Sequence, residues 1–177
     1  MSITKQQSNL NDYQEKMLGI LGERDPLDVL SHTSSRLAEI VSENSVATLR
    51  ARPFTGKWTP NEIIGHLTDS EWVYGYRLRL ILCEEEPTIL GTKQDAWVAG
   101  LRHNEREPTG LVNTFRTLRE INLDLWKRTS AADLQRTGRH NERGQESLDT
   151  MLKLLAGHDL SHLDQIARYL DAIRNPK

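Results

Sequence analysis

The sequence has only one cysteine, Cys83, so an intramolecular disulfide is excluded and nothing indicates an oxidising compartment. Glycine and proline are also sparse, at 11 and 6 of 177 residues, which argues against an all-β or a disordered chain. No uncharged run is long enough to span a bilayer, and the first residues lack the apolar run of a signal peptide. We therefore expect a soluble, cytoplasmic protein that does not bind a membrane.

An excess of charge of one sign is missing as well. The 23 lysines and arginines nearly balance the 25 aspartates and glutamates, and the net charge is −2. Without a broad basic surface, nucleic acid is not an expected partner. A length of 177 residues with 37% hydrophobic residues fits one domain with an adequate core.

Four segments carry apolar residues at the spacing of an amphipathic helix. They cover about residues 25–49, 60–83, 109–129 and 147 onward. The second has the strongest start signal, since Thr59 can cap it, Pro60 can open it and Glu62 can complete a capping box. In the third, Asn122 interrupts the apolar stripe and needs a hydrogen-bond partner if it is buried.

These segments predict an all-α four-helix bundle over residues 25–177, preceded by an arm over residues 1–24. The arm contains a short helix that ends at Gly22. Residues 88–107 are expected to be irregular or to carry one short helix, and residues 130–146 to be a polar connection. Metal sites in bundles are built from inward-pointing side chains on facing helices.

Two histidines stand out in the last predicted helix. His158 and His162 are four residues apart, so they share a face, and they occur where the apolar stripe should continue. Such a pair can chelate a metal ion, and His66 on the second helix is the best candidate for a third ligand. The alternative is a pair at the core edge that is hydrogen-bonded to backbone or to Asp69.

The other three histidines have weaker cases. His32 is interpreted as a surface residue, and His103 lies in a charged run where solvent exposure is expected. His140 lies in the polar connection, beside Arg139 and Arg143, and this connection could fold over a site.

Other metal and nucleophile motifs do not fit. The zincin motif H-E-x-x-H has glutamate where this chain has Asp159, and no later histidine completes the set. Di-iron bundles need Glu-x-x-His on two helices, and neither His158 nor His162 has glutamate three residues earlier. No pattern supports Ser161 or Cys83 as a nucleophile.

Four segments taken together resemble a known family. They are Trp58–Glu71 (WTPNEIIGHLTDSE), Tyr76–Arg79 (YRLR), Asp95–Trp97 (DAW) and Gly157–Ile166 (GHDLSHLDQI). In this order they look like the DinB-like superfamily, which includes the YfiT-like metal-dependent hydrolases and the bacillithiol- and mycothiol-dependent enzymes. The resemblance covers roughly residues 25–172.

The resemblance implies a four-helix bundle with His66, His158 and His162 at the positions of the family's metal ligands. Dimers occur in the family, so a homodimer is compatible with it. DNA binding is not implied, despite the family name.

A site of three neutral imidazoles leaves a coordination position open, as in catalytic metal sites. Zn²⁺ and Ni²⁺ suit imidazole ligands. The ion could activate water for hydrolysis, or hold a low-molecular-weight thiol as thiolate for transfer.

Asp69 and Asp159 are candidates for orienting or catalytic roles, and Arg139 and His140 for binding a thiol cofactor. The leading hypothesis is a thiol transferase acting on a small-molecule substrate. A metal-dependent hydrolase and a non-catalytic binding bundle are the alternatives.

Overall fold

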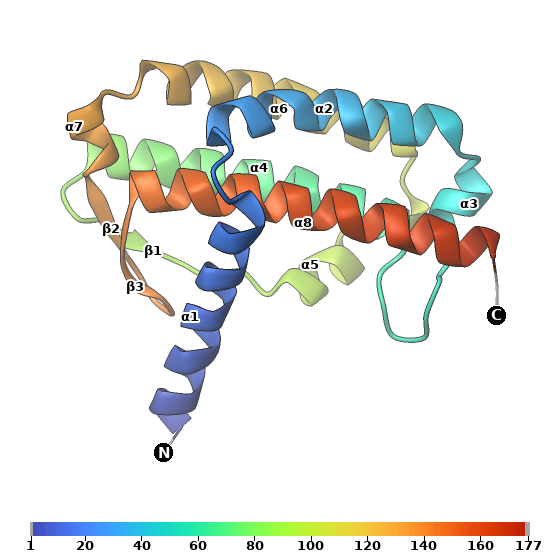
Figure 1. Ribbon diagram of the computed structural model, residues 1–177, viewed down its shortest axis with the longest axis horizontal. Coiled ribbons are helices and arrows are strands. Elements are labelled where there is room, and N and C mark those ends of the chain that lie inside the picture. Colours follow the sequence, from blue (N-terminus) through green and yellow to red (C-terminus); the bar gives the residue numbers. More distant parts are fainter. Residues whose placement is uncertain (1, 176–177) are drawn as a thin grey trace.

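The computed structural model describes residues 2–175, with side chains from residue 12 onward, so Met1, Lys177 and the side chain of Leu10 lie outside it. Four long helices form a bundle, as predicted (Figure 1). The elements are α1 (Ser2–Leu21), α2 (Pro26–Glu43), α3 (Val46–Arg50), α4 (Pro60–Cys83), β1 (Thr88–Ile89), α5 (Gln94–Gly100), the 3-10 helix η1 (His103–Glu105), α6 (Pro108–Arg128), α7 (Ala131–Leu134), β2 (Thr137–His140), β3 (Gly144–Ser147) and α8 (Leu148–Arg174). No described helix is both long and apolar enough to cross a membrane.

The bundle has two layers, with α2 and α6 in one and α4 and α8 in the other (Figure 1). The colours of Figure 1 show that α4 and α6 run in the same direction, and that α2 and α8 run in the opposite one. Because α4 and α6 are parallel, the chain between them must return along the bundle. The segment 84–107 makes this return, and its α5 and η1 pack against α4.

Two connections differ from the expectation. The helix expected over residues 25–49 is broken at Asn44 and Ser45, where the Ser45 side chain caps a separate helix, α3. The polar connection 130–146 holds α7 and an antiparallel hairpin of β2 and β3. This hairpin pairs in parallel with β1 to form a small three-stranded sheet at one end of the bundle (Figure 1).

Local signals fix where the two site-bearing helices begin. The Thr59 side chain accepts from the Glu62 N–H while the Glu62 side chain accepts from the Thr59 N–H, which is the predicted capping box. At α8 the Ser147 side chain caps the helix by accepting from the Thr150 N–H. These caps fix the first residue of α4 and of α8, and with it the face of each helix on which a given side chain lies.

The bundle core consists of two apolar clusters. One includes Leu30, Leu78 and Met151, and the other includes Leu37 and Phe115. All four bundle helices contribute to both clusters. Between them, each helix places buried polar residues, namely Thr33 on α2, His66 and Glu71 on α4, Arg119 and Asn122 on α6, and His158 and Asp159 on α8. A polar layer therefore crosses the middle of the bundle.

The arm helix α1 packs against α8 next to this layer and projects away from the bundle (Figure 1). Met17 and Leu21, four residues apart on one face of α1, are buried in the contact. The two backbones meet at Gly157, where an added Cβ would overlap the carbonyl oxygen of Met17. Glycine beside His158 thus allows α1 to lie against the site.

We predict that Gly157→Ala lowers the free energy of unfolding, by on the order of 1–3 kcal/mol, because the overlapping atom is backbone and cannot rotate away. Gly110→Ala on α6 is the matched control, since an added Cβ there meets nothing within 4 Å. It should be neutral or slightly stabilising. Urea unfolding of the two variants measures the difference, and equal midpoints would contradict this packing.

Candidate metal centre

His66, His158 and His162 come together in the polar layer, as the sequence predicts. The ring centroids lie 5.0 Å apart for His66 and His158, 4.8 Å for His66 and His162, and 4.4 Å for His158 and His162. His66 and His158 are buried and His162 is half-buried. Trp58 covers the cluster, with its ring 4.9 Å from that of His66 and stacked at 6.3 Å on that of His162.

Hydrogen bonds indicate which ring nitrogens face the centre. Nδ1 of His162 donates to Oε1 of Gln165 at 2.9 Å, which leaves Nε2 with its lone pair. Nδ1 of His158 faces Oδ1 of Asp159 at 4.0 Å, and neither atom has a hydrogen-bond partner among the described residues. A small shift would close this contact and direct the lone pair of Nε2 to the centre.

The environment keeps the rings of His66 and His162 neutral. Burial, and then the neighbouring His158, lowers the pKa of His66 far below its ordinary value. The same two causes lower the pKa of His162 to about 3, against the opposing hydrogen bond of Gln165. Neutral imidazole is the form that binds metal ions.

The spacing of the donor atoms fits a divalent ion. One nitrogen from each ring lies within 4.8 Å of the others, and the Nε2 atoms of His66 and His158 are 2.9 Å apart. In a tetrahedral zinc site the ligand nitrogens are roughly 3.3 Å apart, which falls between these distances. The three residues would therefore hold Zn²⁺ or Ni²⁺ after small side-chain movements.

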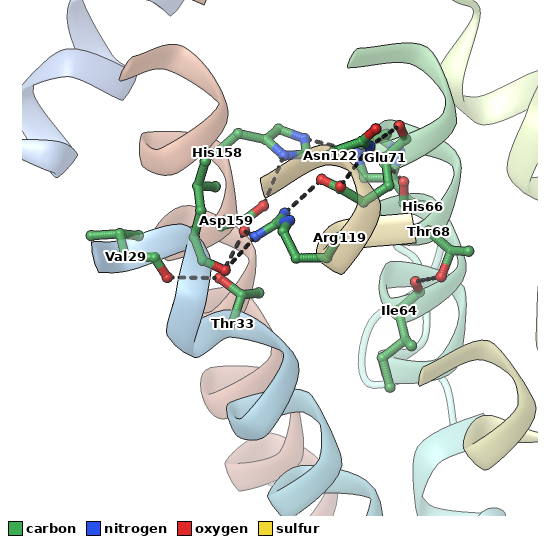
Figure 2. Close-up of polar contacts among 12 residues, drawn as sticks. Val29, Thr33, Ile64, His66, Thr68, Glu71, Arg119, Asn122, His158 and Asp159 are labelled. Atoms are coloured by element: carbon green, nitrogen blue, oxygen red, sulfur yellow. Dashed lines mark hydrogen bonds and ion pairs between the residues drawn. The ribbon is translucent and has the colours of Figure 1, made fainter. Parts of the chain in front are cut away.

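A buried charge network lies beneath the histidines (Figure 2). Arg119 donates to Asp159 at 2.8 Å, to Glu71 at 2.7 Å and to the Leu30 carbonyl at 2.8 Å. Thr33 also donates to Asp159, at 2.7 Å. Asn122 donates to Glu71 at 3.1 Å, so it has the partner that the sequence required.

Asp159 belongs to this charge network and not to the wall of the pocket described below. It is fully buried and pairs with Arg119. Burial works to raise the pKa of Asp159, but the adjacent Arg119 charge outweighs burial and lowers the pKa to about 2. An ionised carboxylate near Nδ1 of His158 favours the tautomer that a metal ligand needs.

Asp69 has a different environment. It is half-buried, lines the pocket and accepts a hydrogen bond of 2.7 Å from Nε2 of His103. The expectation that His103 is exposed is wrong, since the residue is fully buried. Arg102, which precedes His103, has a left-handed backbone that turns the His103 side chain inward. The imidazole of His103 packs on Gly65, where an added Cβ would overlap the ring. The charged residues around His103 in sequence gave no indication that its side chain is buried.

A pocket of about 280 Å³ opens beside His66 and His158. One face of α4 lines it over three turns, because residues three and four apart share a helix face. The facing walls consist of Tyr13 from α1, Gln94 and Trp97 from α5, and Glu142 and Arg143 from the turn of the hairpin.

The hairpin alters the prediction for Arg139 and His140. Neighbouring strand residues point to opposite faces, so Arg139 is exposed on the outer side while His140 is buried, and neither lines the pocket. Arg143 is the hairpin arginine that reaches it. Sequence reasoning missed Tyr13 and Arg77, and chose Arg139 rather than Arg143 from the basic connection. Arg77 lies on the His66 face of α4 and could have been found from its spacing.

Comparison with known proteins agrees with this architecture. The sequence profile of the DinB superfamily matches residues 30–166, most of the chain. The chain belongs to the DinB superfamily. In the solved structure of YfiT from Bacillus subtilis, described as a "probable metal-dependent hydrolase with an unusual four-helix bundle topology", this DinB-superfamily fold recurs with a TM-score of 0.73. That match has 22% identity and covers 81% of this chain and 84% of YfiT.

Curated relatives are similar along part of their length. Two proteins of Oceanobacillus iheyensis, each named "putative metal-dependent hydrolase", are 30% and 26% identical over 112 and 133 residues. The first match covers 63% of this chain and 64% of the relative, and the second covers 75% and 76%. A Bacillus mycoides protein of the same name is 28% identical over 63% of this chain and 64% of its own length. The chain thus spans slightly under two thirds of the relatives it matches first.

Without a bound metal ion, the protein should have a lower free energy of unfolding in acid than at neutral pH. His66 and His162 stay neutral well below pH 6.5 when folded, and burial, followed by Arg143, lowers the pKa of His140 to about 4. The unfolded chain protonates all three near 6.5, so it binds more protons and the free energy of unfolding falls below that pH. The loss is at most about 1.4 kcal/mol per pH unit and histidine.

Urea unfolding of the metal-free chain from neutral pH down to pH of about 5 measures this loss. His140→Gln should make the free energy of unfolding depend less steeply on pH, because one of the three histidines with a lowered pKa is removed. A midpoint that is independent of pH over this range would contradict the neutral state of the buried histidines.

Proposed function

We propose that this chain is a metal-dependent hydrolase of small molecules that uses His66, His158 and His162 as metal ligands. One observation carries the proposal, namely that the two buried histidines and the carboxylate of Asp69 face the same pocket. The names of the relatives support hydrolysis as the reaction class. When bound, a divalent ion supplies Lewis-acid activation of the nucleophile.

The nucleophile must come from outside the protein. Cys83 is exposed at the C-terminal end of α4, and no cysteine lines the pocket. The hydroxyl of Ser70 donates to the His66 carbonyl at 2.9 Å and has no base beside it. Water is therefore the simplest attacking group.

Asp69 is the proposed general base. It follows His66 by three residues on α4, so the two side chains lie on one face of the helix. His103 donates to its Oδ2 and holds the carboxylate in place, while Oδ1 is left to accept a proton. As the water oxygen attacks the electrophilic atom, its proton passes to Asp69. Asp69 then gives this proton to the leaving group as the substrate bond breaks, so that one water is added across the bond and the carboxylate is regenerated.

Asp69→Asn should lower turnover by about 10²- to 10⁴-fold, because the amide cannot accept the proton. Metal content and stability should change little, since the amide oxygen can still accept from His103. Asp164→Asn is the matched control, as Asp164 is exposed on α8 and pairs with Arg168. Steady-state kinetics with metal analysis of each variant measures this, and full activity in Asp69→Asn would remove Asp69 from the mechanism.

Asp159→Asn should lower the stability of the protein, unlike Asp69→Asn, which should lower turnover. Removing its charge leaves Arg119 with one carboxylate in the core, and breaking a buried ion pair costs about 3–5 kcal/mol. Urea unfolding should show this loss before any kinetic effect is interpreted. An unchanged midpoint would mean that the network does not hold the bundle.

Thiol transfer remains the second candidate. The pocket, at about 280 Å³, far exceeds the roughly 30 Å³ that one water occupies, so a second reactant has room. Zinc- and nickel-loaded protein should be assayed against activated esters, amides and phosphate esters with and without a small thiol. Turnover without thiol supports hydrolysis, and turnover that strictly requires thiol would replace it with S-transfer.

A further inference from the structure

Arg77 is a buried cation in the wall of the pocket. It is 5% exposed and lies eleven residues after His66 on the same face of α4, about 16 Å along the helix axis. It therefore lies toward the end of the pocket away from the histidines.

The protein leaves Arg77 largely unpaired. Its Nη2 donates to the Leu90 carbonyl at 2.6 Å, and no carboxylate of the described residues lies within ion-pair distance. Its Nε and Nη1 have no hydrogen-bond partner in the described part of the chain. A buried cation without a counter-charge is costly unless a ligand supplies one.

His140 does not supply the missing acceptor. Its Nδ1 accepts from the backbone N–H groups of Glu142 at 3.1 Å and Arg143 at 3.3 Å, so the ring proton resides on Nε2. This Nε2–H lies 3.5 Å from Nη2 of Arg77, and both atoms are donors. The contact favours an acceptor that is not part of the protein.

Arg143, the other arginine of the pocket, is paired. It donates to both carboxylate oxygens of Glu146, at 3.0 and 2.7 Å, and Gln14 also contacts that carboxylate. The carboxylate of Glu142 lines the pocket as well, but it is exposed and lies against Gly91. Arg77 is thus the pocket cation with free donors.

Two tyrosine hydroxyls add donors beside Arg77. Tyr13 and Tyr74 line the pocket, and neither hydroxyl has a hydrogen-bond partner among the described residues. The Arg77 guanidinium lies 5.3 Å from the ring centre of Tyr74. Burial raises the pKa of both tyrosines, so both hydroxyls remain donors at neutral pH.

We propose that Arg77, Tyr13 and Tyr74 form an oxyanion-binding subsite for a carboxylate or phosphate group of the substrate. This inference rests on the hydrolase function proposed above, and it implies that the substrate is an elongated anion. Its charged end binds at Arg77, and its reacting bond lies beside the histidines.

The test is calorimetric titration of the full-length protein with inorganic phosphate and, separately, with acetate. Arg77→Gln should weaken binding by about 10- to 100-fold, the effect of losing a charged hydrogen-bond donor. Arg139→Gln is the matched control, because Arg139 is exposed on β2, does not line the pocket and should leave binding unchanged when replaced. The relative affinities of phosphate and acetate show which group the subsite prefers.

Titrations of metal-free and zinc-loaded protein separate the subsite from the ion. Binding that persists without metal and depends on Arg77 supports the inference. Absence of millimolar binding of both probes, equal binding by Arg77→Gln, or binding that requires zinc and ignores Arg77 would overturn it. If Arg77→Gln does not fold by circular dichroism, Tyr74→Phe, which keeps the charge, replaces it. It should bind a few-fold more weakly, and unchanged binding there would overturn the subsite.

These outcomes are independent of the hydrolase assay. Arg77-dependent anion binding without any turnover keeps the subsite and removes the proposed function. Equal turnover of anionic substrates by wild type and Arg77→Gln keeps the function and removes the subsite.

Discussion

One side chain connects all four helices of the bundle. Arg119 on α6 donates to the Leu30 carbonyl on α2, to Glu71 on α4 and to Asp159 on α8. A buried ion pair often adds little net stability, but its geometry restricts which rotations of the helices satisfy it, and losing one partner is costly. We hypothesise that this constraint sets the rotation of α4 and α8, since Glu71 and Asp159 lie close in sequence to His66 and His158. On this hypothesis, one buried guanidinium orients the helices that carry His66, His158 and His162.

The charges of this network also suit a cation. Arg119 contributes one positive charge against the two negative charges of Glu71 and Asp159, so the buried triad has a net charge of −1. It lies next to the three histidines, of which His66 and His162 are held neutral by burial. A divalent ion next to this layer would be stabilised by the residual negative charge.

The parallel course of α4 and α6 requires a long return segment between them. That segment brings His103 and Trp97 to the face of α4 that lines the pocket.

The sequence predicts the bundle because the apolar periodicity and the capping signals of α4 and α8 are local and agree with each other. His158 and His162 are predictable for the same reason, since each replaces an apolar residue on an inward face. His66 lies at the margin of the apolar stripe of α4 and is predicted as the best candidate for a third ligand. The roles of the partners depend on contacts that no local pattern encodes. The left-handed backbone of Arg102 and the space at Gly65 accompany the burial of His103, and Asp159 pairs with an arginine forty residues away in sequence. The hairpin was unrecognised because its strands are four residues long and polar, so the outward direction of Arg139 could not be inferred.

X-ray absorption at the metal edge tests the central claim most directly. Protein purified without a nickel column and loaded with one equivalent of zinc should show about three imidazole nitrogens at about 2.0–2.1 Å, with no sulfur ligand. The remaining coordination should come from a light atom that an added small thiol or inhibitor can displace. A sulfur ligand in the untreated protein, a shell with fewer than three imidazoles, or an unchanged spectrum in His162→Ala would contradict the three-histidine centre.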